Sequence, residues 1–227
     1  KKKKKIADVQ NKNRGLFITF EGGEGAGKTT LINSIYKELI RKKAQVIKTH
    51  APGGTELGKH LRDLLLHSRE FHILKKTELF LFMTDRAQHV DEIILPALKS
   101  HHIVLCDRFN DSTIAYQSAE KAFSKKDLQF FCSLAATHLV PDLTFFLDLP
   151  PEIGLQRAMQ RKNDQKDRIQ DKEIAFHEGV RRSYLEIIQE DPNRFYVLDA
   201  NISLDEIFQQ AMEVINKKMP SSICMSQ

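Results

Sequence analysis

The chain of 227 residues has little cysteine and no long apolar run. Its three cysteines, Cys106, Cys132 and Cys224, are far apart and show neither a disulfide framework nor zinc-ligand spacing. We therefore expect free thiols in a reducing, cytoplasmic compartment. A run of about 18 apolar residues is missing, so we expect no membrane-spanning helix and no membrane partner. No apolar stretch follows the lysines at its start, which argues against a secretory signal.

Positive charge is scarce where a nucleic-acid-binding domain would need it. The net charge of +5 and a pI near 9.0 suggest a polyanionic partner. However, residues 1–14 alone carry +6, so the rest of the chain carries −1. The basic character thus belongs to the first residues, and we expect no nucleic-acid partner. We predict a disordered basic leader over 1–14 and a C-terminal tail over 219–227.

Internal repeats and low-complexity linkers are also missing, which favours a single domain over residues 15–218. Short apolar runs predict five strands, at 16–20, 45–49, 102–106, 143–149 and 194–199. Helical patterns lie between and after them, at 29–42, 56–67, 76–99 (one or two helices), 111–120, 124–138, 151–161, 171–190 and 203–218. This alternation predicts an α/β fold, a five-stranded parallel sheet with helices on both faces. Ligands of such folds bind at the carboxyl ends of the strands.

Glycines are concentrated in the turn after the first predicted strand. The segment Gly22-Gly23-Glu24-Gly25-Ala26-Gly27-Lys28-Thr29 matches the phosphate-loop pattern G-x-x-x-x-G-K-[ST] between a strand and a helix. Its backbone N–H groups and the helix N-terminus favour phosphate oxygens. Lys28 is suited to the β- and γ-phosphates, and the Thr29 hydroxyl to Mg²⁺. The sequence therefore predicts a nucleoside triphosphate site that includes Gly22, Gly23, Glu24, Gly25, Ala26, Gly27, Lys28, Thr29 and Thr30.

An acid and an arginine follow the third predicted strand. Asp107 is placed to hold Mg²⁺ beside the phosphate loop, and the planar fork of Arg108 suits phosphate oxygens. Taken alone, the pair is equally well interpreted as a strand-end salt bridge.

The same segment continues as D-R-F-x-x-S-x-x-A-Y-Q over residues 107–117. Together with the loop EGGEGAGKTT, this pattern resembles the thymidylate kinase (dTMP kinase) family of the bacterial type, over about residues 15 to 218. Supporting motifs are Pro52-Gly53-Gly54-Thr55, Phe82-x-x-x-Arg86 and Asp167-Arg168-Ile169. The resemblance implies a P-loop nucleoside monophosphate kinase fold that transfers the γ-phosphate of ATP to dTMP, giving dTDP and ADP, with Mg²⁺ as cofactor.

The resemblance also implies how dTMP is bound. Phe82 would stack on thymine, and Arg86 would hydrogen-bond its carbonyl edge. Thr113 and Gln117 would address the base, and Tyr116 would lie against the deoxyribose. Without the resemblance, ordinary core packing is the better interpretation of Phe82.

The resemblance further implies where phosphoryl transfer takes place. Arg108 would grip the dTMP phosphate, with Glu24 nearby, while Lys28 serves the transferred group and Thr29 and Asp107 hold the metal. A basic lid over about 157–170 would close over the phosphates, and its transition-state arginines are Arg161 and Arg168. A solvated, charged helix end is the alternative interpretation of this segment. The family also implies a homodimer, for which the apolar stretch 79–98 is the expected interface.

Three departures from the family pattern leave alternatives open. His50-Ala51 stands where relatives carry Arg-Glu, Gln170 replaces an acid, and residues 118–122 lack the usual glycine and arginine. A protonated His50 is one substitute for the missing arginine. The alternatives are a kinase of another deoxynucleotide, a deoxynucleoside kinase with Glu21 or Asp107 as base, and a nucleotide-binding scaffold without turnover.

Overall fold

The computed structural model describes residues 14–67, 70, 72–160, 168–169 and 171–219. Five strands and ten helical segments alternate along this part of the chain. In chain order they are β1 (Phe17–Gly22), α2 (Lys28–Arg41), β2 (Val46–His50), α3 (Glu56–Leu66), α4 (Lys75–His89), the π-helix η1 (Val90–Ile94), α5 (Leu95–Lys99), β3 (Ile103–Asp107), α6 (Asn110–Ala119), α7 (Lys125–Ala135), β4 (Leu143–Asp148), α8 (Pro151–Met159), α9 (Ile174–Glu190), β5 (Phe195–Asp199) and α10 (Leu204–Lys218).

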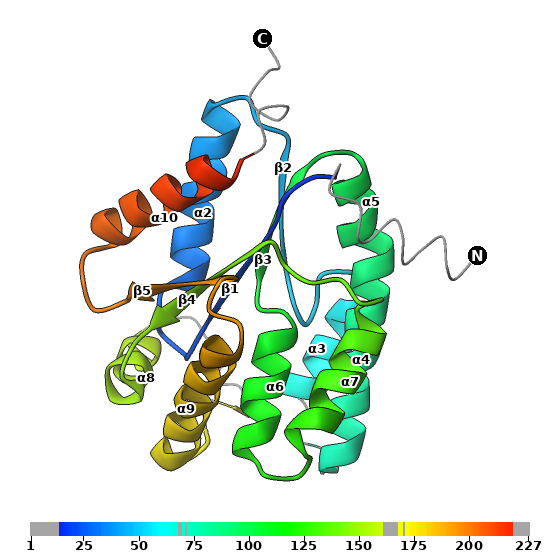
Figure 1. Cartoon of the computed structure of the whole chain (residues 1–227). Coiled ribbons are helices and arrows are strands. Elements are labelled where there is room, and N and C mark those ends of the chain that lie inside the picture. The colour runs from blue at the N-terminus through cyan, green and yellow to red at the C-terminus, as the bar shows by residue number, and fades with distance from the viewer. Residues whose placement is uncertain (1–13, 68–69, 71, 161–167, 170, 220–227) are drawn as a thin grey trace.

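The strands form one parallel sheet in the order β2-β3-β1-β4-β5. Every residue of the central strand β1 is buried, because helices cover both faces of the sheet. Helices α2 and α10 lie together on one face, and α4, α6, α7 and α9 lie on the other (Figure 1). The predicted five-stranded parallel sheet with helices on both faces is confirmed.

The core on each face follows from the spacing of apolar residues. In α2, buried Leu31, Ile35 and Leu39 recur every four residues and pack on the sheet with Ile207 and Ile215 of α10. On the opposite face, residues from α4, α6, α7 and α9 pack around strands β4 and β5. Helices α4 and α6 of this second layer also form walls of a cleft at the carboxyl edge of the sheet.

The stretch 76–99, predicted as one or two helices, forms three consecutive helical segments. The N–H of Leu95 bonds to the carbonyl of Val90, five residues back, which gives η1 its wider turn. Pro96 has no N–H to offer the carbonyl of residue 92, so the regular α-helical pattern is broken next to this turn. The sequence signal for the division was therefore Pro96.

Arg14 belongs to the folded part of the chain. Its guanidinium donates to both carboxylate oxygens of Asp142, at 2.8 and 3.0 Å, although the sequence placed it in the leader. Residues 1–13 of that predicted leader and 220–227 of the predicted tail lie outside the described residues. No helix within the described ranges is long and apolar enough to cross a membrane.

Candidate functional site

The phosphate loop joins β1 to α2 at the carboxyl end of the central strand. Gly27 lies directly before α2 with a φ of 87°, and Gly25 has a φ of 67°. A Cβ on Gly25 would lie 2.0 Å from the carbonyl oxygen of Gly154 in α8, so a side chain is excluded there. The loop therefore approaches α8 closely, and α2 begins with its N-terminus at the loop, as the sequence predicts.

Lys28 is the first residue of α2 and folds back over the loop. Its Nζ donates to the carbonyl oxygens of Gly22 (3.1 Å) and Gly23 (2.8 Å). Burial and then the charge of Arg108 lower the pKa of Lys28 to about 8. The ammonium is thus held inside the loop by two carbonyls that a phosphate can replace.

Two oxygen ligands meet beside this lysine. The hydroxyl of Thr29 donates to Oδ2 of Asp107, at 2.8 Å, where the end of β3 faces the start of α2. A hydroxyl and a carboxylate are the ligand types that Mg²⁺ takes, together with phosphate oxygens and water. The predicted metal residues are therefore adjacent.

Two clefts open along the carboxyl edge of the sheet. The first, about 530 Å³ in volume, is lined by the phosphate loop and by residues that end or follow β2 and β3. The second, about 130 Å³, lies among α3, α4, α6 and the residues Arg168, Ile169, Lys172 and Phe176. Glu24, Ala51, Arg62 and Arg108 line both. The clefts therefore meet at a junction that contains two arginines and one carboxylate.

Arg62 is a residue of the junction that the sequence did not predict. Its Nη1 donates to the carbonyl of Pro52 at 2.9 Å, which holds the guanidinium over the turn before α3. A signal was present, because Arg62 is four residues after buried Gly58 and three before buried Leu65. This spacing places the arginine on the face of α3 that packs against the molecule.

Arg108 occupies the centre of the junction in a left-handed backbone conformation, with a φ of 66°. Its Nη2 pairs with Oε1 of Glu24 at 2.6 Å, and its Nη1 donates to the carbonyl of Gly22 at 3.0 Å. The Tyr116 hydroxyl also donates to Glu24, at 3.1 Å. Burial opposes the charge on Glu24, but Arg108 and Lys28 outweigh it and lower its pKa.

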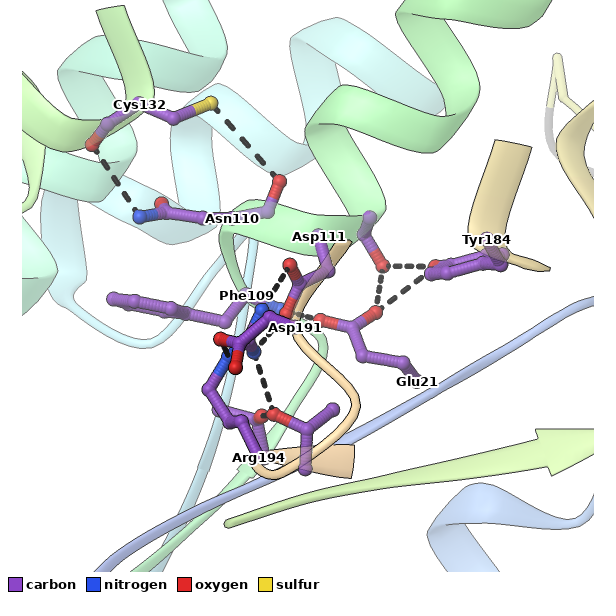
Figure 2. Close-up of polar contacts among 11 residues, drawn as sticks. Glu21, Phe109, Asn110, Asp111, Cys132, Tyr184, Asp191 and Arg194 are labelled. Atoms are coloured by element: carbon purple, nitrogen blue, oxygen red, sulfur yellow. Dashed lines mark hydrogen bonds and ion pairs between the residues drawn. The ribbon is translucent and has the colours of Figure 1, made fainter. Parts of the chain in front are cut away.

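A buried network supports the turn that carries Arg108 (Figure 2). One oxygen of Glu21 accepts from the backbone N–H of Phe109 at 2.7 Å. The other accepts from the hydroxyls of Ser112 (2.5 Å) and Tyr184 (2.9 Å). The Ser112 hydroxyl in turn accepts from Nη1 of Arg108 at 3.2 Å. Glu21 thus links the end of β1 to the arginine turn and to α9.

The carboxylate of Glu21 is occupied by these contacts. Burial, and after it the charge of Asp111, raise its pKa. Asp111 is itself paired with both Nη atoms of Arg194, at 2.7 and 3.0 Å (Figure 2). Because Glu21 is absent from the linings of both clefts, the structure gives no support to its use as a base on a bound nucleoside.

The second cleft brings together all five residues predicted to contact the base and sugar. They are Phe82, Arg86, Thr113, Tyr116 and Gln117. Arg86 is buried with its guanidinium 4.3 Å from the centre of the Phe109 ring. Within the described ranges, its Nε and Nη1 have no hydrogen-bond partner, and neither has Oε1 of Gln117. Buried polar atoms normally have partners, so these atoms indicate a polar ligand.

Most of the predicted lid lies outside the described residues, and Arg161 and Gln170 lie there too. Arg168 is described, and it lies at the rim of the second cleft. It pairs with Glu78 at 3.1 Å and donates to the carbonyl of Leu65 at 3.1 Å. In this conformation Arg168 contacts the acceptor side and is absent from the lining of the phosphate-loop cleft.

His50, which the resemblance places in the position of an arginine, lines the first cleft. Burial and the neighbouring charge of Arg62 lower its pKa. This shift works against the protonated form that would replace an arginine. Arg62 is the cation that does reach the junction from this side.

The chain is similar to known proteins over most of its length. The sequence profile of the family described as thymidylate kinase matches residues 20–211. A thymidylate kinase from Protochlamydia amoebophila (strain UWE25) is 46% identical over 217 residues, covering 93% of this chain and 96% of the relative. One from Shouchella clausii (strain KSM-K16) is 38% identical over 209 residues, covering 92% and 98%. The solved thymidylate kinase from Ehrlichia chaffeensis superposes with a TM-score of 0.73 and 29% identity, covering 89% of this chain and 98% of that one.

The matched region spans the phosphate loop, the junction and the described walls of the second cleft. Both the sequence relatives and the solved structure carry the same family name. This chain belongs to the thymidylate kinase family, whose members transfer the γ-phosphate of ATP to dTMP.

Proposed function

We propose that the phosphate-loop cleft binds ATP, that the second cleft binds dTMP, and that the γ-phosphate is transferred at their junction. The observation that carries this proposal is that Glu24, Ala51, Arg62 and Arg108 line both clefts. Two phosphorylated ligands that approach each other repel, so cations are needed where they meet. Arg62 and Arg108 supply that charge, and Lys28 supplies it on the ATP side.

The reaction needs no base from the protein, because the acceptor phosphate is already an anion at neutral pH. Positioning and charge stabilisation then supply most of the rate. The Arg108 guanidinium is held by Gly22 and Ser112 and contacts Glu24. On dTMP binding, the phosphate competes with Glu24 for Arg108. Glu24 then stays beside the acceptor through the hydroxyl of Tyr116.

Thr29 and Asp107 are the residues that would hold Mg²⁺. Their oxygen atoms are 2.8 Å apart next to the phosphate loop, and both are ligand types that this ion takes. The ion, when bound, neutralises charge on the phosphate oxygens. Lys28 leaves the carbonyls of Gly22 and Gly23 for the β- and γ-phosphates.

The aromatic and polar groups that line the second cleft suit a thymine nucleotide. Phe82 offers an aromatic face, and Arg86 offers unpartnered donors to a base carbonyl. Tyr116 lies between this cleft and the junction, where it contacts Glu24 and crowds a ribose 2′-hydroxyl. Arg161 and Arg168 stay the two predicted transition-state arginines of the lid. Arg168 reaches that role only by leaving Glu78.

We further propose a homodimer, in the cytoplasm, that forms through α4 and α7. Within the stretch 79–98, Leu79, Val90 and Ile94 are buried in the core of this chain, whereas Phe80 is 43% exposed. Its ring packs edge-on against Phe131 of α7, at 5.7 Å between centroids. Further large apolar side chains are exposed on α7 and after it, namely Phe130, Leu134 and Val140. Pairing through this surface would remove them from water. Sedimentation of wild type and Phe130→Glu tests the proposal, with a monomeric variant expected.

A coupled assay of ADP release tests the kinase proposal. Purified protein with ATP and Mg²⁺ is given dTMP, dUMP, dCMP, dGMP or thymidine in turn. We expect turnover with dTMP and little with thymidine, which has no phosphate for Arg108 to bind. ATP binding without turnover of any acceptor would contradict the proposal and favour a scaffold.

A further inference from the structure

We infer that Glu78 selects the base of the acceptor, because it fixes which end of the Gln117 amide faces the second cleft. This inference rests on the proposed binding of dTMP in that cleft. Nε2 of Gln117 donates to Oε1 of Glu78 at 3.0 Å. Gln117 is only 3% exposed, and among the described residues its Oε1 has no partner. The cleft therefore contains a buried acceptor with its orientation set from behind.

The orientation follows from what a carboxylate is able to do. A carboxylate accepts hydrogen bonds and donates none, so the NH₂ end of the amide must face it. Turning the amide over would set its carbonyl oxygen against Oε1 of Glu78. The other oxygen of Glu78 pairs with Arg168 at 3.1 Å, which holds the carboxylate in place. Glu78 thus acts through Gln117 as a positioning residue.

A fixed acceptor discriminates between pyrimidines. Thymine and uracil carry an N3–H donor beside carbonyl acceptors, whereas N3 of cytosine is an acceptor beside an amino donor. The Gln117 oxygen together with the unpartnered donors of Arg86 matches the first pattern. Cytosine would leave the Gln117 oxygen facing another acceptor in a buried site, which is costly. Glu78 therefore favours thymine and uracil nucleotides over cytosine nucleotides.

The test is the isosteric substitution Glu78→Gln. A glutamine at this position offers a donor as well as an acceptor, so the Gln117 amide becomes free to turn over. We expect the ratio of dCMP to dTMP dissociation constants, measured by calorimetry, to fall about tenfold. Affinity for dUMP should change in parallel with dTMP, because the two share the same base edge. Affinity for ATP should not change.

A matched control is available where α4 is followed by η1. Glu92 accepts from Nε2 of Gln88 at 2.5 Å in an exposed Glu–Gln pair that lines neither cleft. Glu92→Gln should keep the wild-type selectivity. Gln117→Met removes the amide and leaves Glu78 in place, so it should lower the same ratio. In that background, Glu78→Gln should have no further effect on the ratio.

The outcomes separate this inference from the proposed function. If wild type neither binds nor phosphorylates dTMP, both are overturned. If wild type prefers dTMP and folded Glu78→Gln keeps the full preference, only the role of Glu78 is overturned. It is also overturned if Glu78→Gln lowers the ratio equally with and without Gln117, since the effect would then come from lost pairing with Arg168. If Glu78→Gln does not fold, an unchanged ratio in Gln117→Met overturns the inference.

Discussion

The donor and acceptor clefts are built in different ways. The donor cleft is built around one contiguous stretch, residues 24–29, to which residues at the ends of β2 and β3 are added. The acceptor cleft takes its side chains from α3, α4, α6 and the segment around Arg168. Phosphate binding by a loop needs local sequence only, whereas recognition of a base needs side chains that tertiary packing brings together. Substitutions should therefore affect the two clefts separately, except at the junction.

The largest difference between the effects on the acceptor cleft and on the donor cleft is expected for Arg108→Ala. Removing this guanidinium should lower kcat/KM for dTMP by about 10³-fold, because a buried cation is lost where phosphate charge concentrates. ATP affinity, measured by calorimetry, should stay within a few-fold. Arg182→Ala is the control, since Arg182 is exposed on α9 and its ion pair there is a 3.9 Å contact with Glu178. Unchanged dTMP turnover in Arg108→Ala would contradict its place at the junction.

Glu21→Gln should give a smaller effect that is again confined to the acceptor cleft. The amide oxygen keeps one acceptor for Phe109, but the NH₂ group no longer accepts from Ser112 and Tyr184. A displacement of the Arg108 turn by about 1 Å should lower kcat/KM for dTMP by roughly 10²-fold. ATP affinity should be retained. Tyr184→Phe removes one hydroxyl of the network and should give a weaker loss in the same direction.

The two clefts also differ in how much of them the sequence predicts. Motif spacing identified the donor loop with its lysine and Thr29, and the position of Asp107 at the end of a predicted strand placed it at the same edge of the sheet. The acceptor residues Phe82 and Gln117 followed from family resemblance, since an aromatic or amide side chain in a helix has no local signature of a ligand.

What the sequence missed depends on long-range packing. The contact of Arg62 with the junction requires α3 to lie across the turn after β2, and the contact of Glu78 with Gln117 joins α4 to α6. The hydrogen bonds of Glu21 reach residues 88, 91 and 163 positions away in the chain. The five parallel strands and the helices on both faces of the sheet were predicted, because they depend on apolar periodicity. Polar networks depend on the exact placement of those layers.

The clefts should also respond differently to pH. Burial lowers the pKa of Lys28 to about 8 in the free protein, so its charge is lost as pH rises through that value. We expect kcat/KM for ATP to fall about tenfold per pH unit above 8. With ATP saturating, phosphate contact restores the charge, so kcat/KM for dTMP should stay level between about pH 7 and 9. Lys28→Arg should remove the decline, since arginine keeps its charge.

The lowered pKa of Lys28 also makes the free energy of unfolding depend on pH. The ordinary lysine pKa of 10.5 applies to the unfolded chain, and the folded value is about 8. Between these values the unfolded state binds more protons, so this lysine's contribution to the free energy of unfolding rises with pH. Comparing wild type with Lys28→Met by denaturant unfolding at pH 7.5 and 9.5 measures it. A decrease at the higher pH relative to Lys28→Met would contradict the burial of Lys28.

The smallest expected effect tests whether a helix cap serves the acceptor cleft alone. Thr55 caps α3 by accepting from the N–H of Gly58 at 2.9 Å, and α3 carries Arg62. Ser203 caps α10, on the opposite face of the sheet. Thr55→Ala and Ser203→Ala should each cost about 1 kcal/mol of unfolding free energy. Only Thr55→Ala should also raise the KM for dTMP, by about two- to threefold, because a loosened N-terminus of α3 shifts Arg62 at the junction. An equal rise in both variants would show that the effect follows global stability and that the acceptor cleft is not sensitive to its own helix.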